Sequence, residues 1–227
     1  MYVTHGLLLI LAALLLWGLV WAIPKKSVIS LLFVVVPLCP PMLALSWSEY
    51  KWTTLEDRLT DVAVAVAETD EAEVKCERIW GAFFNATNRD GFVSNDVTGE
   101  LGNLAVLSYD SCRRVQQWIA LEDKTEATLE QVTAVHVLTH EFFHIRKVRA
   151  EDVTECYAVQ NDWQTVQGLG GTRQEAETFQ TVYYRSVYPR LNDTYYSSEC
   201  RDDGLYDLEP GVQNFPPKPD TARVTLD

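Results

Sequence analysis

Two histidines four residues apart stand on either side of a glutamate in the segment His140-Glu141-Phe142-Phe143-His144. On an α-helix, side chains four residues apart lie on one face, so both imidazoles can contact a single metal ion. Neutral histidine nitrogens bind Zn²⁺ at about 2.0–2.1 Å. A carboxylate beside the first histidine can reach a water molecule on that ion and take its proton as the water attacks a carbonyl. The pattern predicts a zinc hydrolase site with His140 and His144 as ligands and Glu141 as general base.

A third protein ligand is expected in the next helical segment, residues 150–167. Glu151 and Glu155 lie four residues apart there, on one face. If this helix folds back antiparallel, its first turn lies beside His144 and its second beside His140. Glu151 then suits the metal, and Glu155 suits a hydrogen bond to an imidazole. The reverse assignment of the two glutamates stays open.

Other residues near this segment are assigned more general roles. His136 falls on the same helical face as His140, and a packing or ligand-orienting role is expected for it. The alternative for the whole group is a set of ordinary core histidines with Glu151 and Glu155 on a solvated face. Burying Glu141 without a use would be costly, which favours the metal site. A tyrosine that stabilises the transition state is expected among Tyr157, Tyr195 and Tyr196.

The motif HEFFH followed by E-x-x-x-E, within residues 137–160, resembles the gluzincin metallopeptidases. The resemblance implies that His140, His144 and Glu151 bind zinc and that Glu141 is the general base. The separation of His144 from Glu151 is shorter than in most gluzincins, and the second carboxylate is Glu155 rather than an aspartate. The metzincin pattern fits worse. The surrounding stretch is also similar to small uncharacterised membrane or secreted proteins of actinobacteria and their phages, which implies no substrate.

The N-terminal part of the chain is apolar. Residues 6–24 carry no charge and have about the length that a helix needs to cross a bilayer. After Lys25 and Lys26, a second uncharged run covers residues 27–46 and contains three prolines. Residues 1–48 are therefore predicted to form a two-helix transmembrane hairpin with its lysine-bearing turn in the cytoplasm. A cleavable signal peptide is the alternative for the first run.

The remainder, residues 49–227, is strongly acidic. All 32 aspartates and glutamates of the chain lie from Glu49 onward. Such a surface repels phosphate backbones, so nucleic acid is excluded as a partner. The predicted partners are the lipid bilayer and a peptide or protein substrate, with the acidic domain on the extracytoplasmic side of the cell membrane.

Four of the five cysteines lie in the acidic domain, and Cys39 lies in the second apolar run. In an oxidising compartment the four should pair, and three connectivities are possible. We favour Cys76 with Cys112 and Cys156 with Cys200, each bridge contributing about 3–4 kcal/mol in the chain-entropy model. Free thiols in a cytoplasmic domain are the alternative.

The acidic domain is predicted to be mainly α, a small zincin-like helical domain stabilised by the disulfides. A loop is expected over 85–102 and an irregular tail from Tyr195. Thr128 and Gln131 have the spacing of a helix capping box. Helical spacing of apolar residues appears in residues 52–81 (one or two helices), 104–121, 129–148, 150–167 and 172–188.

The predicted function is that of a membrane-tethered zinc metallopeptidase acting outside the cytoplasm. A non-catalytic envelope protein that retains a zincin-like fold and binds a partner is the main alternative. Zinc-dependent hydrolysis of another amide or ester is the third possibility, since the site chemistry does not select the acyl group.

Overall fold

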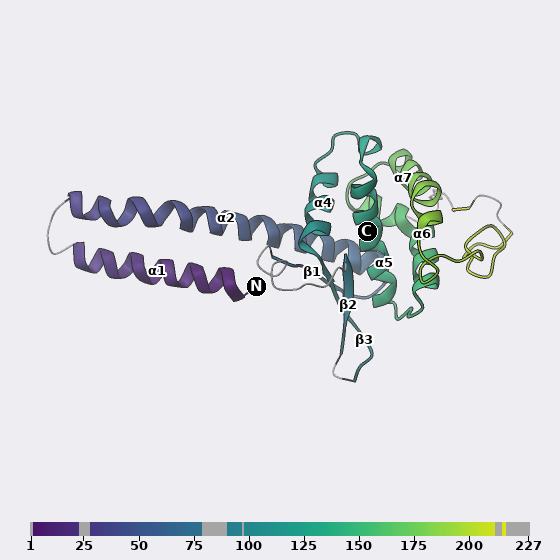
Figure 1. Ribbon diagram of the computed structural model, residues 1–227, viewed down its shortest axis with the longest axis horizontal. Helices are drawn as coiled ribbons and strands as arrows, with labels where there is room; N and C mark the ends of the chain where they lie inside the picture. Colours follow the sequence, from purple (N-terminus) through teal and green to yellow (C-terminus); the bar gives the residue numbers. More distant parts are fainter. Residues whose placement is uncertain (1, 23–27, 79–89, 97, 212–214, 217–227) are drawn as a thin grey trace. The chain divides into compact units, whose positions relative to one another are not determined.

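The computed structural model describes residues 2–22, 28–78, 90–96, 98–211 and 215–216 (Figure 1). Its chain divides into two compact units, Met1–Leu55 and Glu56–Asp227. Most of the described residues are helical, so the prediction of a mainly α chain is confirmed. The elements in chain order are α1 (Tyr2–Ala22), α2 (Val28–Ala67), β1 (Glu73–Cys76), β2 (Gly91–Asn95), β3 (Leu101–Leu107), α4 (Tyr109–Ile119), η2 (Lys124–Glu126), α5 (Leu129–Ile145), α6 (Glu151–Gly168), α7 (Arg173–Ser186) and η3 (Tyr188–Arg190).

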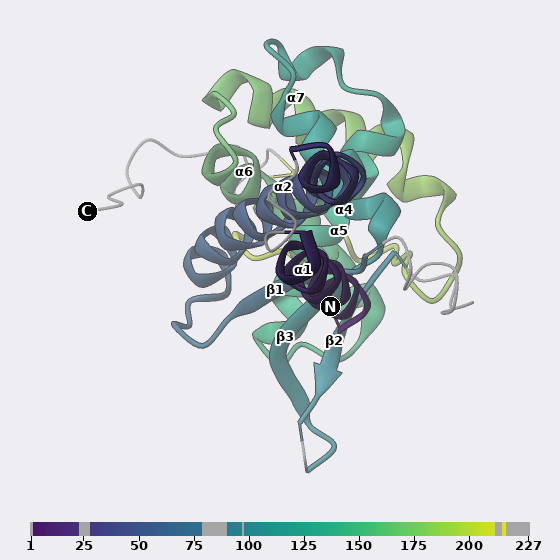
Figure 2. The same cartoon turned by 90° about the vertical axis from the view of Figure 1, so that its left-hand side faces the viewer.

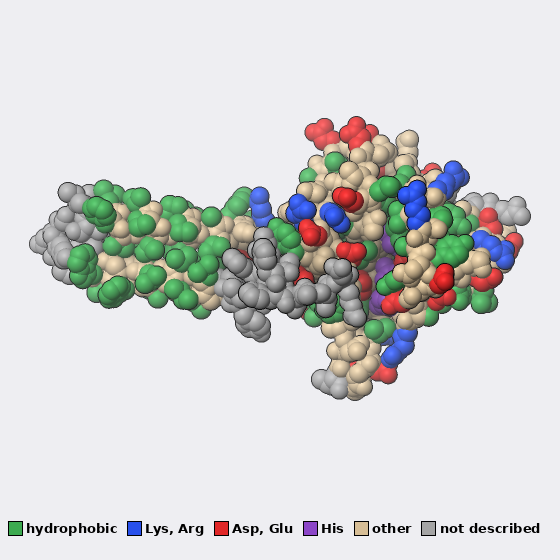
Figure 3. All heavy atoms as spheres, viewed as in Figure 1, with side chains coloured by type: hydrophobic (Ala, Val, Ile, Leu, Met, Phe, Trp, Pro, Cys, Tyr) green, Lys and Arg blue, Asp and Glu red, His purple; other side chains and the backbone are tan. Residues whose placement is uncertain are grey.

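The described residues of the first unit form helices that are mostly apolar. Large hydrophobic side chains such as Leu9, Trp17 and Phe33 are exposed on α1 and α2. Figure 3 shows hydrophobic side chains, in green, along the surface of these helices. One helical segment of the described residues, Leu32–Ala67, is long and apolar enough to cross a membrane by length and composition. The apolar helical segment Gly6–Trp21 is shorter than such a span. The predicted two-pass topology therefore stays a prediction, and its lysine-bearing turn lies outside the described residues.

Helix α2 runs further than the sequence suggested. The sequence analysis placed the boundary between the membrane hairpin and the acidic domain after residue 48, and α2 continues across this position, from Val28 through Pro37, Pro40 and Pro41 to Ala67. A proline removes one backbone hydrogen bond and crowds the preceding turn, which the flanking turns here tolerate. Beyond residue 55 the predicted helical periodicity holds, because Leu59 and Val62 are buried in the core of the second unit.

A three-stranded sheet in the second unit was not predicted. Its order is β1-β3-β2, with β1 parallel to β3 and β2 antiparallel to β3. The expectation of helix over residues 104–107 and at β1 was wrong, because these residues form strands. The helix expected there begins at Tyr109, where the hydroxyl of Ser108 accepts a hydrogen bond from the Ser111 amide. Figures 1 and 2 show the β2–β3 hairpin extending beyond the helices of this unit.

Helix α5 is the central element of the second unit. It contacts α4, α6 and α7 on its sides and also contacts β2 and β3. The capping box predicted at its start is present: Thr128 Oγ1 accepts from the Gln131 amide, and Gln131 Oε1 accepts from the Thr128 amide. Leu138 and Phe142 of α5 are fully buried, as is Trp118 of α4. The core therefore encloses the helix that carries both site histidines.

Both favoured disulfides are present. Cys76–Cys112 joins β1 to α4, and Cys156–Cys200 joins α6 to the tail. Cys39 is free. Two disulfides favour an oxidising compartment for the second unit.

Candidate metal centre

A tight turn brings α6 back against α5. The amide of Lys147 donates to the carbonyl of His144, and the amide of Val148 donates to that of Phe143, which is the hydrogen-bond pattern of a Schellman helix end. Lys147 itself adopts a left-handed conformation with φ of 68°. The chain reverses within these few residues, so the first turn of α6 lies beside the last turn of α5.

Lys147 also fastens this turn to the sheet. Its ammonium group donates to the carbonyls of Leu101 and Gly102 and to the side-chain oxygen of Asn103, at 2.6–3.0 Å. A left-handed conformation is unfavourable for a lysine. Three hydrogen bonds to the start of β3 offset that cost and fix the distance between the turn and the β2–β3 hairpin.

Three acceptor atoms meet where α5 faces the start of α6. His140 Nε2 lies 3.0 Å from His144 Nε2 and 3.0 Å from Glu151 Oε2. His144 Nε2 lies 3.3 Å from the same carboxylate oxygen. Both imidazoles are buried, and Glu151 is half-buried at the edge of a cavity. One carboxylate oxygen of Glu151 therefore lies close to the Nε2 atoms of both histidines of the motif.

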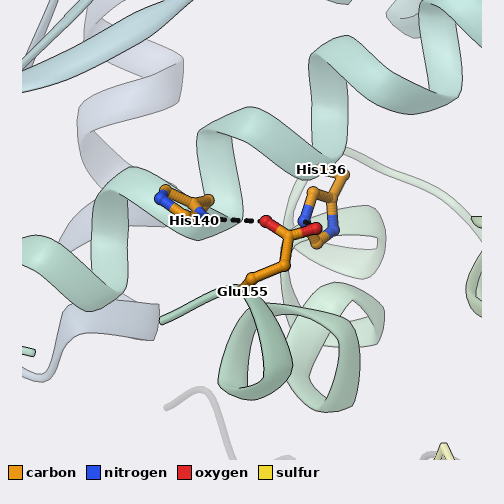
Figure 4. A group of neighbouring side chains, drawn as sticks. All are labelled: His136, His140 and Glu155. Atoms are coloured by element: carbon orange, nitrogen blue, oxygen red, sulfur yellow. Dashed lines mark hydrogen bonds and ion pairs between the residues drawn. The ribbon is translucent and has the colours of Figure 1, made fainter. Parts of the chain in front are cut away.

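The second nitrogen of each imidazole is occupied elsewhere. His140 Nδ1 lies 2.9 Å from Glu155 Oε2 (Figure 4). His144 Nδ1 lies 2.7 Å from the carbonyl oxygen of Val148. Both partners are hydrogen-bond acceptors, so in the neutral rings the proton sits on Nδ1 and the Nε2 lone pair is free. Glu155 thus contacts His140 on the side away from Glu151.

These three atoms fit a metal ion. Without a positive charge between them, two imidazole lone pairs and a carboxylate oxygen at about 3 Å would repel one another. Ligands placed tetrahedrally at about 2.0–2.1 Å from an ion stand about 3.3 Å apart, close to the separations observed. The group formed by His140, His144 and Glu151 could therefore hold a metal ion.

In the metal-free site, the contacts between the imidazoles and the glutamates shift the pKa values of His140 and Glu151. Burial lowers the pKa of His140, but hydrogen bonds to Glu151 and Glu155 outweigh burial and raise it to about 9. Hydrogen bonds from His140 and His144 lower the pKa of Glu151 to about 2. A proton or a metal ion is thus bound strongly at this position.

Glu141 lies beside the ligands and close to the sheet. Its carboxyl is buried, and its Oε2 atom has no hydrogen-bond partner among the described residues. Burial raises the pKa of Glu141 to about 7, although His140 and His144 partly oppose that rise. A carboxyl group with this pKa can accept and release a proton near neutral pH.

A cavity of about 630 Å³ opens over this face of α5. Its walls come from α5, the start of α6, strand β2 and the segment after α7, and histidine side chains are visible on the face shown in Figure 3. Apolar lining residues include Phe92, Val137 and Leu191. The candidate metal position is therefore reachable by a ligand with both polar and apolar groups.

The three candidate tyrosines lie in different surroundings. Tyr195 lines the cavity, and its ring centroid is 5.9 Å from that of His140. Tyr157 packs edge-on against Phe143, and Tyr196 packs against Tyr188. Of these three, the structure brings Tyr195 to the cavity.

Two residues that the sequence analysis did not identify also lie next to the site. Tyr183 of α7 donates to Glu155 Oε1 at 2.5 Å, and Asp162 of α6 contacts His136 at 2.8 Å. Asp162 lies seven residues after Glu155 and so on the same face of α6, a spacing that could have indicated it. Nothing in the local sequence marks Tyr183.

Comparison with known proteins gives no assignment: no family model matches the chain, and neither a curated protein nor a solved structure shows a significant match.

Proposed function

We propose that this chain is a membrane-anchored zinc metallopeptidase with its catalytic domain outside the cytoplasm. One observation carries the proposal. The Nε2 atoms of His140 and His144 converge with Oε2 of Glu151, while the Nδ1 atom of each imidazole is hydrogen-bonded to another acceptor. Three protein ligands at the wall of an open cavity are typical of catalytic zinc, whereas structural zinc sites are closed by four.

The donor set favours zinc, and the short HExxH…ExxxE pattern supports a gluzincin-like arrangement. Two imidazole nitrogens and one carboxylate oxygen suit Zn²⁺. A bound zinc ion would supply Lewis acidity for a substrate carbonyl and for a water molecule. Glu155, which contacts His140 Nδ1, would orient that ligand rather than bind the ion.

Glu141 is the proposed general base. Its carboxylate follows His140 directly in the chain, lines the cavity and keeps Oε2 without a partner among the described residues. It would accept the proton of the attacking water and return it to the leaving amine. Positioned proton transfer of this kind typically accounts for about 10²–10⁴-fold in rate.

Strand β2 supports a peptide as the substrate rather than another amide or ester. Among the described strands it pairs only with β3, at the edge of the sheet, and Gly91, Phe92 and Val93 line the cavity. An extended peptide can add to such an edge through main-chain hydrogen bonds. That placement would lay a peptide bond beside Glu141, which lies close to Gly91.

The proposed anchor is a two-pass hairpin formed by α1 and the first part of α2. A Cβ added at Gly18 would lie 2.6 Å from Val34 Cγ1, so the two helices approach closely where α1 has no side chain. Such small-residue contacts are typical of membrane helix pairs. Labelling a cysteine placed at Lys26 in intact cells tests the topology: the proposal expects no reaction with an impermeant maleimide, and reaction equal to that of an extracellular control contradicts it.

The enzymatic proposal is tested with the full-length chain in detergent. Metal content and cleavage of a peptide library are compared for wild type, His140→Ala and Glu141→Gln, with Glu130→Gln as a matched change on the exposed face of α5. We expect about one zinc ion per chain in wild type, none in His140→Ala, and retained zinc with at least about a 10²-fold loss of kcat in Glu141→Gln. Glu130→Gln should behave as wild type.

Two results would overturn the proposal. If wild-type protein contained no stoichiometric zinc, the proposed metal centre would be contradicted. Zinc without cleavage of any peptide, or with equal cleavage by wild type and Glu141→Gln, would instead favour a non-catalytic envelope protein that keeps the ion for its fold.

A further inference from the structure

A buried group of side chains lies next to His140, and three of its members, His136, Glu155 and Tyr183, also line the cavity. Glu155 is its centre (Figure 4). One carboxylate oxygen, Oε2, accepts from His140 Nδ1 at 2.9 Å. The other, Oε1, accepts from the Tyr183 hydroxyl at 2.5 Å and lies 3.1 Å from His136 Nε2, without hydrogen-bond geometry to that nitrogen. Both carboxylate oxygens of Glu155 therefore already accept a hydrogen bond from another side chain of the protein.

His136 continues the group away from the metal position. Its Nδ1 atom lies 2.8 Å from Asp162 Oδ2, and its ring stacks on that of Tyr183 with centroids 3.6 Å apart. His136, Asp162 and Tyr183 are each at most 2 % exposed. Three different helices, α5, α6 and α7, contribute to this one contact network.

The network has a direct effect on His140. Burying a carboxylate is costly unless its oxygens are paired, and Glu155 is 3 % exposed. The Tyr183 hydroxyl and the neighbouring His136 ring hold the carboxylate in one orientation. A fixed acceptor at Nδ1 keeps the His140 proton there and turns the Nε2 lone pair toward Glu151 and His144.

We propose that His136, Asp162 and Tyr183 are positioning residues of the metal centre, which act on the ion only through Glu155 and His140. This inference rests on the proposed metal-dependent function and deepens it. The same residues could be considered a second metal site, since His136, His140 and Glu155 place ligand atoms near one another. The contacts favour positioning, because His140 Nδ1 and both Glu155 oxygens already have partners among the described residues.

Metal affinity tests the inference without reference to catalysis. Full-length variants Tyr183→Phe and Asp162→Asn are titrated with Zn²⁺ against a chelator of known affinity, and the absorption of the Co²⁺-loaded protein reports ligand geometry. Loss of a residue that orients a metal ligand typically weakens binding about 10–100-fold. We expect a weakening in that range for both variants, with one ion per chain and an altered Co²⁺ spectrum.

Gln180→Leu is the matched control. Gln180 is also buried on α7, one turn before Tyr183, but it donates to the carbonyls of Val159 and Gln160. Melting of the metal-free proteins measures the purely structural cost of each change. Gln180→Leu should lower the melting temperature and leave zinc affinity within about twofold of wild type, and a loss equal to that of Tyr183→Phe would show a general packing effect and overturn the inference.

The remaining outcomes separate the two proposals. Wild type without zinc contradicts the proposed function itself. Tight zinc binding in wild type, with unchanged affinity in Tyr183→Phe and Asp162→Asn, contradicts the positioning role alone. Two zinc ions per chain, with one lost in His136→Phe, would show that the network is itself a metal site and would also overturn the inference.

Discussion

A Cβ atom added to Gly91 would stand 2.8 Å from Oε1 of Glu141, closer than real Cβ contacts allow. The edge strand β2 and the candidate base on α5 fit together because position 91 carries no side chain. The same added atom would lie 3.0 Å from Leu107 Cδ2, so the space is closed on the sheet side as well. The backbone of β2 can thus lie directly beside the carboxylate.

Gly91→Ala should move Glu141 without removing the metal ligands. The carboxylate is the flexible partner in this contact and has to shift by some tenths of an ångström or more. We expect unchanged zinc content and a kcat lowered by about tenfold or more, since misplacement of a catalytic group is costly. Ser94→Ala in the same strand is the control and should keep full activity, while full activity in Gly91→Ala would contradict the placement of Glu141.

Zinc affinity should fall as the pH is lowered. In the proposed site the ion binds neutral His140, and the pKa of His140 in the metal-free protein is raised to about 9 because hydrogen bonds to Glu151 and Glu155 outweigh burial. Below that pH a proton competes with the metal, so the apparent affinity should drop about tenfold per pH unit. Chelator competition between pH 6.5 and 8.5 measures the slope. In Glu155→Gln the decline should begin at lower pH, and a flat profile in wild type would contradict the prediction.

Tyr195→Phe should lower kcat more than it changes KM. The ring lines the cavity near His140, where a phenolic hydroxyl could stabilise negative charge that develops on the reacting carbonyl. We expect a loss of about 10²-fold in kcat with zinc content and melting temperature little changed. Tyr196→Phe serves as the control because Tyr196 packs on Tyr188 instead. Equal kinetics for the two variants would assign Tyr195 a structural role.

The two disulfides should differ in their effect on activity. Removing either one by paired Cys→Ser changes should cost about 2–5 kcal/mol of unfolding free energy. Cys156 follows Glu155 directly and its bridge holds the segment that carries Tyr195, whereas Cys76–Cys112 joins β1 to α4. Below the melting temperature we therefore expect loss of activity in Cys156→Ser/Cys200→Ser and retained activity in Cys76→Ser/Cys112→Ser. Activity assays beside thermal melts check this difference.

Local signals predicted α5, α6 and α7 well. The predicted Thr128–Gln131 capping box starts α5, and α7 was predicted from helical spacing, although the capping box between Thr172 and Glu175 that starts it was not identified. The antiparallel return of α6, on which the choice of Glu151 as metal ligand was conditional, is present in the structure. These features depend on residues close in the sequence, where spacing and capping chemistry suffice.

The elements and contacts that the sequence analysis missed depend on tertiary contacts between distant parts of the chain. Strand β1 has four residues and lies beside β3, with Val74 opposite Ala105, so its pairing depends on a partner far along the chain. The Tyr183 hydroxyl reaches Glu155 from a third helix, and the closeness of Gly91 to Glu141 depends on how the sheet meets α5. Neither contact has a signature in a short stretch of sequence.

All three candidate ligands lie within residues 140–151, and the chain reversal at Lys147 brings them together in space. Contacts between residues so close along the chain close small loops and form early in folding. An emerging polypeptide would have complete coordination chemistry before Cys200 is available to pair. If the chain binds the proposed ion, metal capture could precede oxidative closure.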